Sequence, residues 1–215
     1  MAGRISALEP QKRSRDRVNV YLDGEFAFGL ADVEATRLRV GEELSDAEIA
    51  NLKAAGELKQ AHEKSLDFLA HRPRSEAEMQ RYLRKRQFSA PVVDEVLERL
   101  KRAALVNDET FAGFWVENRT RFRPRGRRAL VHELRQKGVP AAIIATTLAT
   151  YDEEDAAERC AHQQARRLTH LPPQQFQKRL SQRLARRGFP YEIIRDIIAR
   201  YSSPDSNIIK ESEEY

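Results

Sequence analysis

The chain has 215 residues, of which 40% are apolar and 33% are charged, and its formal net charge is +5. This length allows one large domain or several small ones, and the apolar fraction excludes a wholly disordered chain. Cys160 has no partner cysteine, and neither a signal peptide nor a stretch approaching the roughly 18 apolar residues of a membrane span is present, so we expect a cytoplasmic protein without a membrane partner.

The N-terminal part has the alternating pattern of strands. Apolar residues alternate from Arg17 to Leu30 on both sides of Asp23-Gly24, a dipeptide that suits a type I′ turn because both of its residues tolerate positive φ. A third strand is expected at Ile5–Leu8, followed by a loop over Pro10 and the polar run Gln11–Asp16. The pattern therefore predicts a small three-stranded sheet.

A helix is expected after the sheet. Ser45 and Glu48 form an S-x-x-E capping box, which predicts a helix start at this point. The helix continues towards His71, and Gly56 can interrupt it. Beyond His71 the apolar spacing is helical throughout.

The helical part contains a repeat of about 50 residues. Apolar positions recur at offsets of 51 and then 50 residues, in six sets that share one register. The clearest sets are Val92-Val93, Ile143-Ile144 and Ile193-Ile194; Met79, Leu130 and Leu180; and Leu83, Leu134 and Leu184. Each unit has the spacing of two amphipathic helices, with a further helical stretch upstream at Lys64–His71, Asp108–Arg121 and Glu153–Leu168.

Turn residues recur in the same register. Gly138 and Gly188 stand where a left-handed residue ends a helix, and Pro140 and Pro190 stand where the next helix begins. Gln87 takes the place of the glycine in the first unit, at a cost of about 1 kcal/mol if its backbone is left-handed. The fold class predicted is mostly α, with three tandem three-helix repeats that stack into an elongated, curved body behind a small N-terminal β-sheet.

The predicted domain boundaries follow from this pattern. Residues 1–60 hold the sheet and the start of the linking helix, and residues 61–106, 107–151 and 152–201 are the three repeats. Residues 202–215 are expected to form a flexible acidic tail.

Basic residues gather in the repeats. Residues 61–201 carry 28 Lys and Arg against 18 Asp and Glu, whereas the segments before and after them are net acidic. This distribution favours an anionic partner, and arginine binds phosphate or carboxylate bidentately. The alternative is that these side chains form solvated helix faces and oppose the helix dipole. The predicted contact residues are Arg72, Arg74, Arg84, Lys85, Arg86, Arg121, Arg123, Arg125, Arg127, Arg128, Arg135, Lys137, Arg186 and Arg187.

Signatures of catalysis are missing from the sequence. No G-x-x-x-x-G-K-[ST], G-x-G-x-x-G or H-E-x-x-H motif occurs. Cys160 and His162 are two residues apart on a predicted helix and therefore lie on different faces, which does not suit a metal site. We expect no catalytic residue, no metal and no cofactor.

Aromatic residues near the basic segment divide into two kinds. Phe111, Phe114 and Trp115 have the i, i+3, i+4 spacing of core residues. Phe122 lies between two arginines and is the candidate for stacking against a nucleic-acid base.

Three segments resemble motifs of a known family. Arg72-Pro-Arg-Ser-Glu-Ala-Glu-Met79, Leu105-Val-Asn-Asp-Glu-Thr-Phe-Ala112 and Arg127-Arg-Ala-Leu-Val-His-Glu-Leu-Arg-Gln-Lys-Gly138 closely resemble those of the RecX family, regulators of the RecA recombinase. The resemblance covers about Lys64–Tyr201, and the hairpin region is similar to an N-terminal extension found in some members. The sequence departs from the family pattern at Gln87, where glycine is usual, and at Asn107-Asp108, where two aspartates are frequent.

The resemblance implies a mechanism rather than a reaction. RecX-like proteins lie in the groove of the RecA filament on single-stranded DNA and lower its ATP hydrolysis and strand exchange. We therefore expect a monomeric, non-enzymatic inhibitor that acts in recombination, DNA repair and the SOS response. Its expected partners are the RecA filament and single-stranded DNA, contacted directly or through RecA. The alternative is a free-standing DNA-binding module of basic helices.

Overall fold

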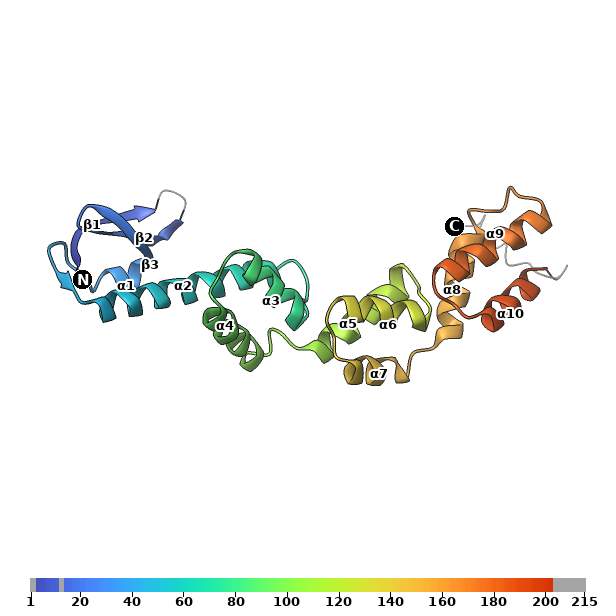
Figure 1. Cartoon of the computed structure of the whole chain (residues 1–215). Coiled ribbons are helices and arrows are strands. Elements are labelled where there is room, and N and C mark those ends of the chain that lie inside the picture. The colour runs from blue at the N-terminus through green and yellow to red at the C-terminus, as the bar shows by residue number, and fades with distance from the viewer. Residues whose placement is uncertain (1–2, 12–13, 203–215) are drawn as a thin grey trace. The chain divides into compact units, whose positions relative to one another are not determined.

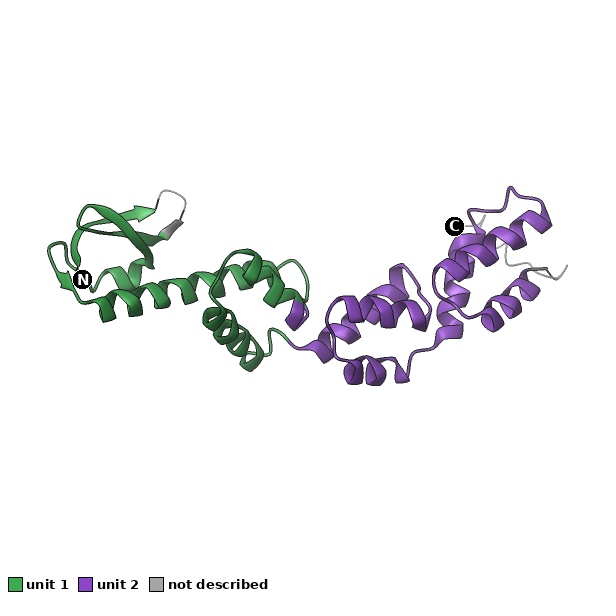
Figure 2. Ribbon diagram, in the orientation of Figure 1, with its two compact units in different colours: residues 1–74, 78–106 green, residues 75–77, 107–215 purple. Residues whose placement is uncertain are grey.

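The computed structural model describes residues 3–11 and 14–202 (Figure 1). The chain divides into two compact units, drawn in different colours in Figure 2. Unit 1 takes in Met1–Arg74 and Glu78–Val106, and unit 2 takes in Ser75–Ala77 and Asn107–Tyr215. Within residues 3–11 and 14–202, no helix is both long and apolar enough to cross a membrane.

Unit 1 begins with an antiparallel sheet of four strands in the order β3-β2-β1-β4. The strands are β1 (Gly3–Gln11), β2 (Ser14–Leu22), β3 (Glu25–Ala31) and β4 (Glu43–Leu44). Asp23 and Gly24 connect β2 to β3 with φ of 50° and 89°, as the predicted type I′ turn requires. The hairpin predicted from the sequence is therefore confirmed.

The sheet corrects two expectations. It has four strands rather than three, because Glu43–Leu44 pairs with Gly3–Arg4 at the free edge of β1. The loop expected over Gln11–Asp16 is largely strand, since β1 ends at Gln11 and β2 begins at Ser14. Pro10 lies inside β1 at a point where β1 pairs with β2 on one side and has no partner strand on the other. An edge position of this kind tolerates the missing N–H of proline.

A short helix, α1 (Asp32–Ala35), leads towards the long helix α2 (Asp46–Leu69). The capping box that starts α2 is confirmed: the Glu48 amide donates to Ser45 Oγ, and the Ser45 amide donates to Glu48 Oε2. The helix continues through Gly56 without a break. Gly56 is instead a packing residue, because a Cβ there would lie 2.5 Å from the carbonyl oxygen of Gly29.

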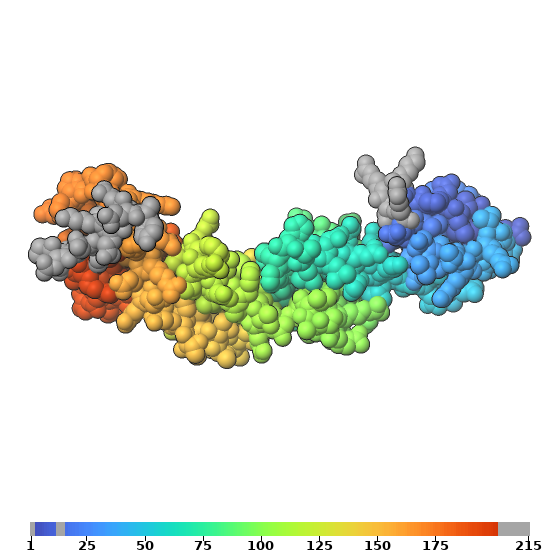
Figure 3. Space-filling view, turned by 180° about the vertical axis from the view of Figure 1, so that it is seen from behind, coloured from blue at the N-terminus to red at the C-terminus, as the bar shows by residue number. Residues whose placement is uncertain are grey.

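In the part of the chain that the structure describes, helices α2 to α10 build the three predicted repeats. The first repeat uses the C-terminal part of α2 with α3 (Glu76–Lys85) and α4 (Ala90–Arg102). Helices α2 and α4 pack against each other. Figure 3 shows the surface of this repeat, coloured from cyan to green. The second repeat is α5 (Asp108–Phe122), α6 (Arg127–Gln136) and α7 (Ala141–Ala149), and the third is α8 (Glu153–Ala165), α9 (Pro173–Arg186) and α10 (Tyr191–Ser202).

Each repeat has a hydrophobic core of its own, built from the register-matched residues. Met79, Leu130 and Leu180 are fully buried, and so are Leu83, Leu134 and Leu184. Equivalent leucines therefore fill equivalent positions, and the repeat register predicted from the sequence is confirmed.

The turns between the second and third helix of each repeat are left-handed. Gln87, Gly138 and Gly188 have φ of 64°, 85° and 86°. Gln87 adopts this conformation although it carries a Cβ, which costs roughly 1 kcal/mol relative to glycine.

The contacts that join successive repeats within unit 2 follow one pattern. Ser75 Oγ donates to the carbonyl of Lys137 (2.6 Å), and the amide of Gly126 donates to the carbonyl of Arg187 (2.9 Å). In both cases the residue just before a middle helix donates to a carbonyl of the next repeat. That carbonyl belongs to the residue just before the left-handed glycine.

A carboxylate then receives the first amide of the middle helices of the first and second repeats, α3 and α6. Asp108 Oδ1 accepts from the Glu76 amide (2.9 Å), and Glu153 Oε1 accepts from the Arg127 amide (2.7 Å). Negative charge is favourable at a helix N-terminus. This arrangement fixes α6 against the third repeat and so positions the basic loop that precedes α6.

Candidate functional site

The basic segment after α5 is a loop, as the sequence predicts. Helix α5 ends at Phe122, and α6 begins at Arg127 after a proline and a glycine. The side chain of Phe122 is 61% exposed, and the guanidinium of Arg121 lies 5.3 Å from the centre of its ring. Phe122 therefore presents an aromatic surface to solvent beside the arginines of the loop.

This loop forms one wall of a hollow in unit 2, between the second and third repeats. The hollow has a volume of about 530 Å³ and no acidic residue among those that line it. Its lining residues, which we call the arginine pocket, are Phe122, Arg123, Arg125, Gln163, Gln164, Arg167, Arg183, Arg186 and Arg187. Six guanidinium groups from separate segments of the chain thus face a single site.

Neutral acceptors orient two of these arginines. Arg183 Nη1 donates to Gln164 Oε1 (3.1 Å), and Arg187 Nη1 donates to the carbonyl of Pro124 (3.4 Å). Because the acceptors carry no charge, they position the guanidinium groups without neutralising them.

The remaining pocket arginines differ in how they are paired. Arg125 Nε lies 3.5 Å from Glu133 Oε1, which compensates part of its charge. The side chains of Arg123, Arg167 and Arg186 form no hydrogen bond or ion pair within the described part of the chain. The pocket therefore carries a large excess of positive charge, which suits a polyanion.

Cys160 lies in the core next to this site. Burial raises the pKa of its thiol, and the positive charges of Arg187 and Arg125 oppose that shift. A thiol with a raised pKa is a poor nucleophile and metal ligand. Across residues 3–11 and 14–202, no cluster of His, Cys, Asp or Glu could hold a metal ion.

Two of the predicted contact residues are held by ion pairs and hydrogen bonds to other parts of the protein. Arg72 makes a bidentate ion pair with Glu78, with distances of 3.0 and 2.9 Å. The guanidinium of Arg127 donates to the carbonyls of Leu148 and Tyr151 and lies 3.9 Å from Glu153. These arginines hold the fold together, a role that basic spacing alone does not reveal.

The first repeat carries a stack of four planar groups in unit 1. The rings of Phe68 and Tyr82 are parallel at 3.9 Å, the guanidinium of Arg74 lies 3.7 Å from the first ring, and that of Arg86 lies 3.7 Å from the second. Burial, followed by the charge of Arg72, lowers the pKa of Arg74. Arg84 and Lys85, also predicted contact residues, are exposed on the same helix end.

Trp115 makes similar contacts with cationic side chains in the second repeat. Its ring lies between Arg119, at 4.4 Å, and Lys137, at 4.9 Å. The indole Nε1 and Arg119 Nε both donate to Glu133 Oε2. Trp115 is therefore packed at the edge of the core, close to its predicted role, and Lys137 is held against it.

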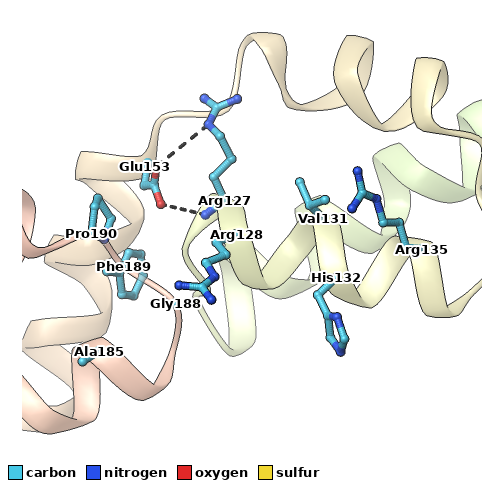
Figure 4. Close-up of a pocket in the computed structure, with 10 residues that line it drawn as sticks. All are labelled: Arg127, Arg128, Val131, His132, Arg135, Glu153, Ala185, Gly188, Phe189 and Pro190. Atoms are coloured by element: carbon cyan, nitrogen blue, oxygen red, sulfur yellow. Dashed lines mark hydrogen bonds and ion pairs between the residues drawn. The ribbon is translucent and has the colours of Figure 1, made fainter.

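A second, more apolar groove runs along α6 (Figure 4). Its volume is about 680 Å³, and Val131 lies on its wall between Arg128 and Arg135 of the same helix. Arg127 and Glu153 are joined by a hydrogen bond and an ion pair where α6 faces the third repeat. The groove combines apolar surface with cationic edges, whereas the lining of the arginine pocket is mainly polar.

The sequence reasoning missed four residues of the arginine pocket. Arg167 and Arg183 were not among the predicted contact residues, nor were Gln163 and Gln164. The repeat register indicates Arg183, because an offset of 50 residues makes it the equivalent of Glu133 in the second repeat. Comparing charges as well as apolar residues between repeats would have found it.

Family models cover almost the whole described chain. The model for the regulatory protein RecX N-terminal domain matches residues 3–45. Those for the first, second and third three-helix domains of RecX match residues 61–100, 107–148 and 152–198. The chain belongs to the RecX family. These matches confirm the resemblance, and with the structure they confirm a mostly α fold of three three-helix repeats behind a small N-terminal sheet.

Individual relatives agree with this assignment. The regulatory protein RecX of Bacillus subtilis (strain 168) is 31% identical over 195 residues, which are 88% of this chain and 74% of that protein. Its counterpart in Geobacillus kaustophilus (strain HTA426) is 37% identical over 166 residues, 76% of this chain and 62% of that protein. These RecX relatives are named regulatory proteins.

Solved RecX structures share the architecture. A crystal structure of regulatory protein RecX has a TM-score of 0.62 at 29% identity and covers 90% of this chain and 99% of its own. The RecX of Lactobacillus salivarius, at 23% identity and a TM-score of 0.57, covers 68% of this chain and 96% of its own and shows the same fold.

Proposed function

We propose that this RecX-family chain is a non-enzymatic regulator that binds the RecA filament on single-stranded DNA and inhibits ATP hydrolysis and strand exchange. The observation that carries the proposal is the arginine pocket of unit 2, a strongly cationic site in a chain of the family. A RecA filament on single-stranded DNA offers phosphates and carboxylates, and guanidinium groups bind both. Binding across adjacent RecA protomers would oppose filament extension.

The test is the ATP turnover of RecA on single-stranded DNA, with RecA from the same organism. Substoichiometric amounts of the full-length chain are expected to depress turnover, because one regulator bound to a filament affects several protomers. Unchanged turnover at equimolar protein would refute the proposal.

A free-standing DNA-binding module is the second candidate, favoured by the polar, acid-free lining of the pocket. It predicts tight binding to bare DNA, with log K falling by roughly 0.7 to 0.9 per phosphate neutralised as log salt concentration increases. The regulator predicts binding to the filament that is much tighter than its binding to bare DNA. Equilibrium binding to both targets at several salt concentrations separates the two functions.

A further inference from the structure

The repeats provide an internal comparison for the arginine pocket. An offset of 50 residues, which relates Leu134 to Leu184, also relates Arg183, Arg186 and Arg187 to Glu133, Gln136 and Lys137. One repeat thus carries three arginines where the other carries an acid, an amide and one lysine. The same three-helix scaffold forms with either set, so the fold does not require the arginines of the third repeat.

The residues that pair with Glu133 and with Arg183 also differ in charge between the two repeats. Asn107 and Asp152 cap the first helices of the second and third repeats. Arg119 and Gln164 follow these caps at the same distance along the chain, so they occupy equivalent positions. Arg119 forms an ion pair with Glu133 at 2.7 Å, whereas Gln164 accepts a hydrogen bond from Arg183. The pair is electrically neutral in the second repeat and carries one positive charge in the third. The third repeat is therefore built to keep charge exposed in the pocket.

Phe122 adds a feature that charge alone does not explain. It is the aromatic residue among the pocket's lining residues, and more than half of its surface is exposed. An exposed ring next to a basic groove is the arrangement by which proteins bind single strands, because each base offers a flat face to the ring while arginines contact the phosphates. An acidic peptide would use the arginines and leave the ring without a partner.

We propose that the arginine pocket binds single-stranded nucleic acid, with one base stacked on Phe122 and the adjacent phosphates held by Arg123, Arg167 and Arg186. This inference rests on the proposed function in so far as it names the component of the filament that the pocket contacts. The oriented guanidinium groups of Arg183 and Arg187 supply further donors to the backbone. The volume of about 530 Å³ lies in the range of sites that hold small organic ligands.

The first experiment separates base stacking from charge. Fluorescence anisotropy measures binding of the full-length chain to a labelled deoxyadenosine 12-mer and to an abasic phosphodiester of the same length. The base-bearing strand is expected to bind about fivefold or more tightly. Phe122→Leu removes this preference, Phe122→Tyr retains it, and both variants fold because the ring is mostly exposed. Equal affinity of the wild-type chain for the two strands overturns the proposal.

The second experiment tests the arginines. Arg123→Ala with Arg186→Ala is expected to weaken binding of both strands equally and to reduce the slope of log K against log salt by about 0.7 per arginine. Arg166→Ala is the matched control, because this exposed arginine lies next to Arg167 but outside the pocket lining. Arg186→Ala alone serves for comparison with this single control, and a loss of binding as large in Arg166→Ala as in Arg186→Ala contradicts the site.

Competition identifies the source of the anion. Tripolyphosphate or poly-glutamate that displaces the deoxyadenosine strand as effectively, charge for charge, as an unlabelled strand would overturn the proposal and indicate a free oligophosphate or an acidic protein segment instead. Weak displacement by both supports a nucleic-acid strand.

The RecA assay keeps this inference and the proposed function apart. If the wild-type chain inhibits RecA and the Phe122 and arginine variants bind the 12-mer as the wild type does, the pocket assignment fails and the regulatory function stands. If the wild type leaves RecA unaffected while the variants lose the 12-mer, the regulatory function fails and the pocket assignment stands.

Discussion

Gln87 illustrates how a single residue can work against the local backbone. The equivalent turns of the second and third repeats use glycine at φ near 85°, whereas Gln87 adopts a φ of 64° with a Cβ attached. Replacing Gln87 by glycine is expected to increase the free energy of unfolding by up to about 1 kcal/mol, because the left-handed strain disappears. Urea denaturation measures the change, and a destabilised variant would contradict this reasoning.

Two glycines of unit 2 should respond in opposite directions to the same change. A Cβ on Gly126 would overlap the carbonyl group of Gly188, whereas one on Gly113 meets no atom within 4 Å. Gly126→Ala is expected to cost about 1–3 kcal/mol through forced overlap at the joint between repeats. Gly113→Ala, on an exposed helix position, should stabilise by about 0.5–1 kcal/mol. Thermal or urea unfolding that shifts both variants in the same direction would refute the comparison.

Tyr151 gives the protein a pH dependence in the alkaline range. Its hydroxyl donates to the carbonyl of Arg125 (2.6 Å), and burial raises its pKa from 10.0 to about 12. The unfolded chain releases this proton near pH 10 while the folded chain retains it, so the free energy of unfolding should fall as the pH rises from 10 towards 12. Below pH 10 the group has no such effect.

Tyr151→Phe tests this dependence. The variant should lose stability less steeply than the wild type above pH 10 in urea titrations. A smaller slope remains, because burial also raises the pKa of Tyr201. Identical slopes in wild type and variant would exclude Tyr151 as a cause.

At the scale of the element, neighbouring residues of α6 have different roles, one in the core and one on the surface. Leu134 is fully buried in the core of the second repeat, whereas its neighbour Arg135 is exposed beside the α6 groove. Leu134→Ala is expected to cost about 2–5 kcal/mol because it leaves a cavity. Arg135→Ala should change stability by less than about 0.5 kcal/mol while weakening inhibition of RecA. Unfolding curves and RecA ATPase assays of the pair decide whether the two roles divide in this way.

Elements also show where periodicity predicts well and where it does not. The middle helices of the repeats follow from apolar spacing, because a buried stripe needs residues every three to four positions. Strand β4 has two residues and no pattern of its own, so pairing with β1 alone defines it. Gly56 resembles a helix break in the sequence but is required by the close approach of Gly29.

At the scale of the whole molecule, arginines divide between those that hold the fold and those that are left for a partner. Arg72 and Arg127 are engaged by carbonyls and carboxylates, whereas Arg123, Arg128 and Arg186 have side chains without such partners in the described residues. The three unengaged residues, replaced together by alanine, should weaken inhibition of RecA and leave the unfolding curve nearly unchanged.

Two controls accompany this triple variant. Replacing Arg99, Arg102 and Arg195 removes the same charge from exposed ion pairs and should leave inhibition intact. Arg127→Ala should destabilise the protein by about 1–3 kcal/mol, because the partly buried carbonyls of Leu148 and Tyr151 lose their donor. Full inhibition by a folded triple variant would remove these arginines from the site.

The sequence by itself determined the repeat, its register, the core leucines and the left-handed turns, because apolar periodicity and turn residues are local properties of the chain. It also placed the basic loop and Phe122 together. Only the tertiary structure decided which arginines face a common pocket and which are bound internally. The partner of an arginine depends on how close separate segments lie in space, as for Arg183 with Gln164 and Arg127 with Leu148. Residue spacing along a single helix does not give those distances.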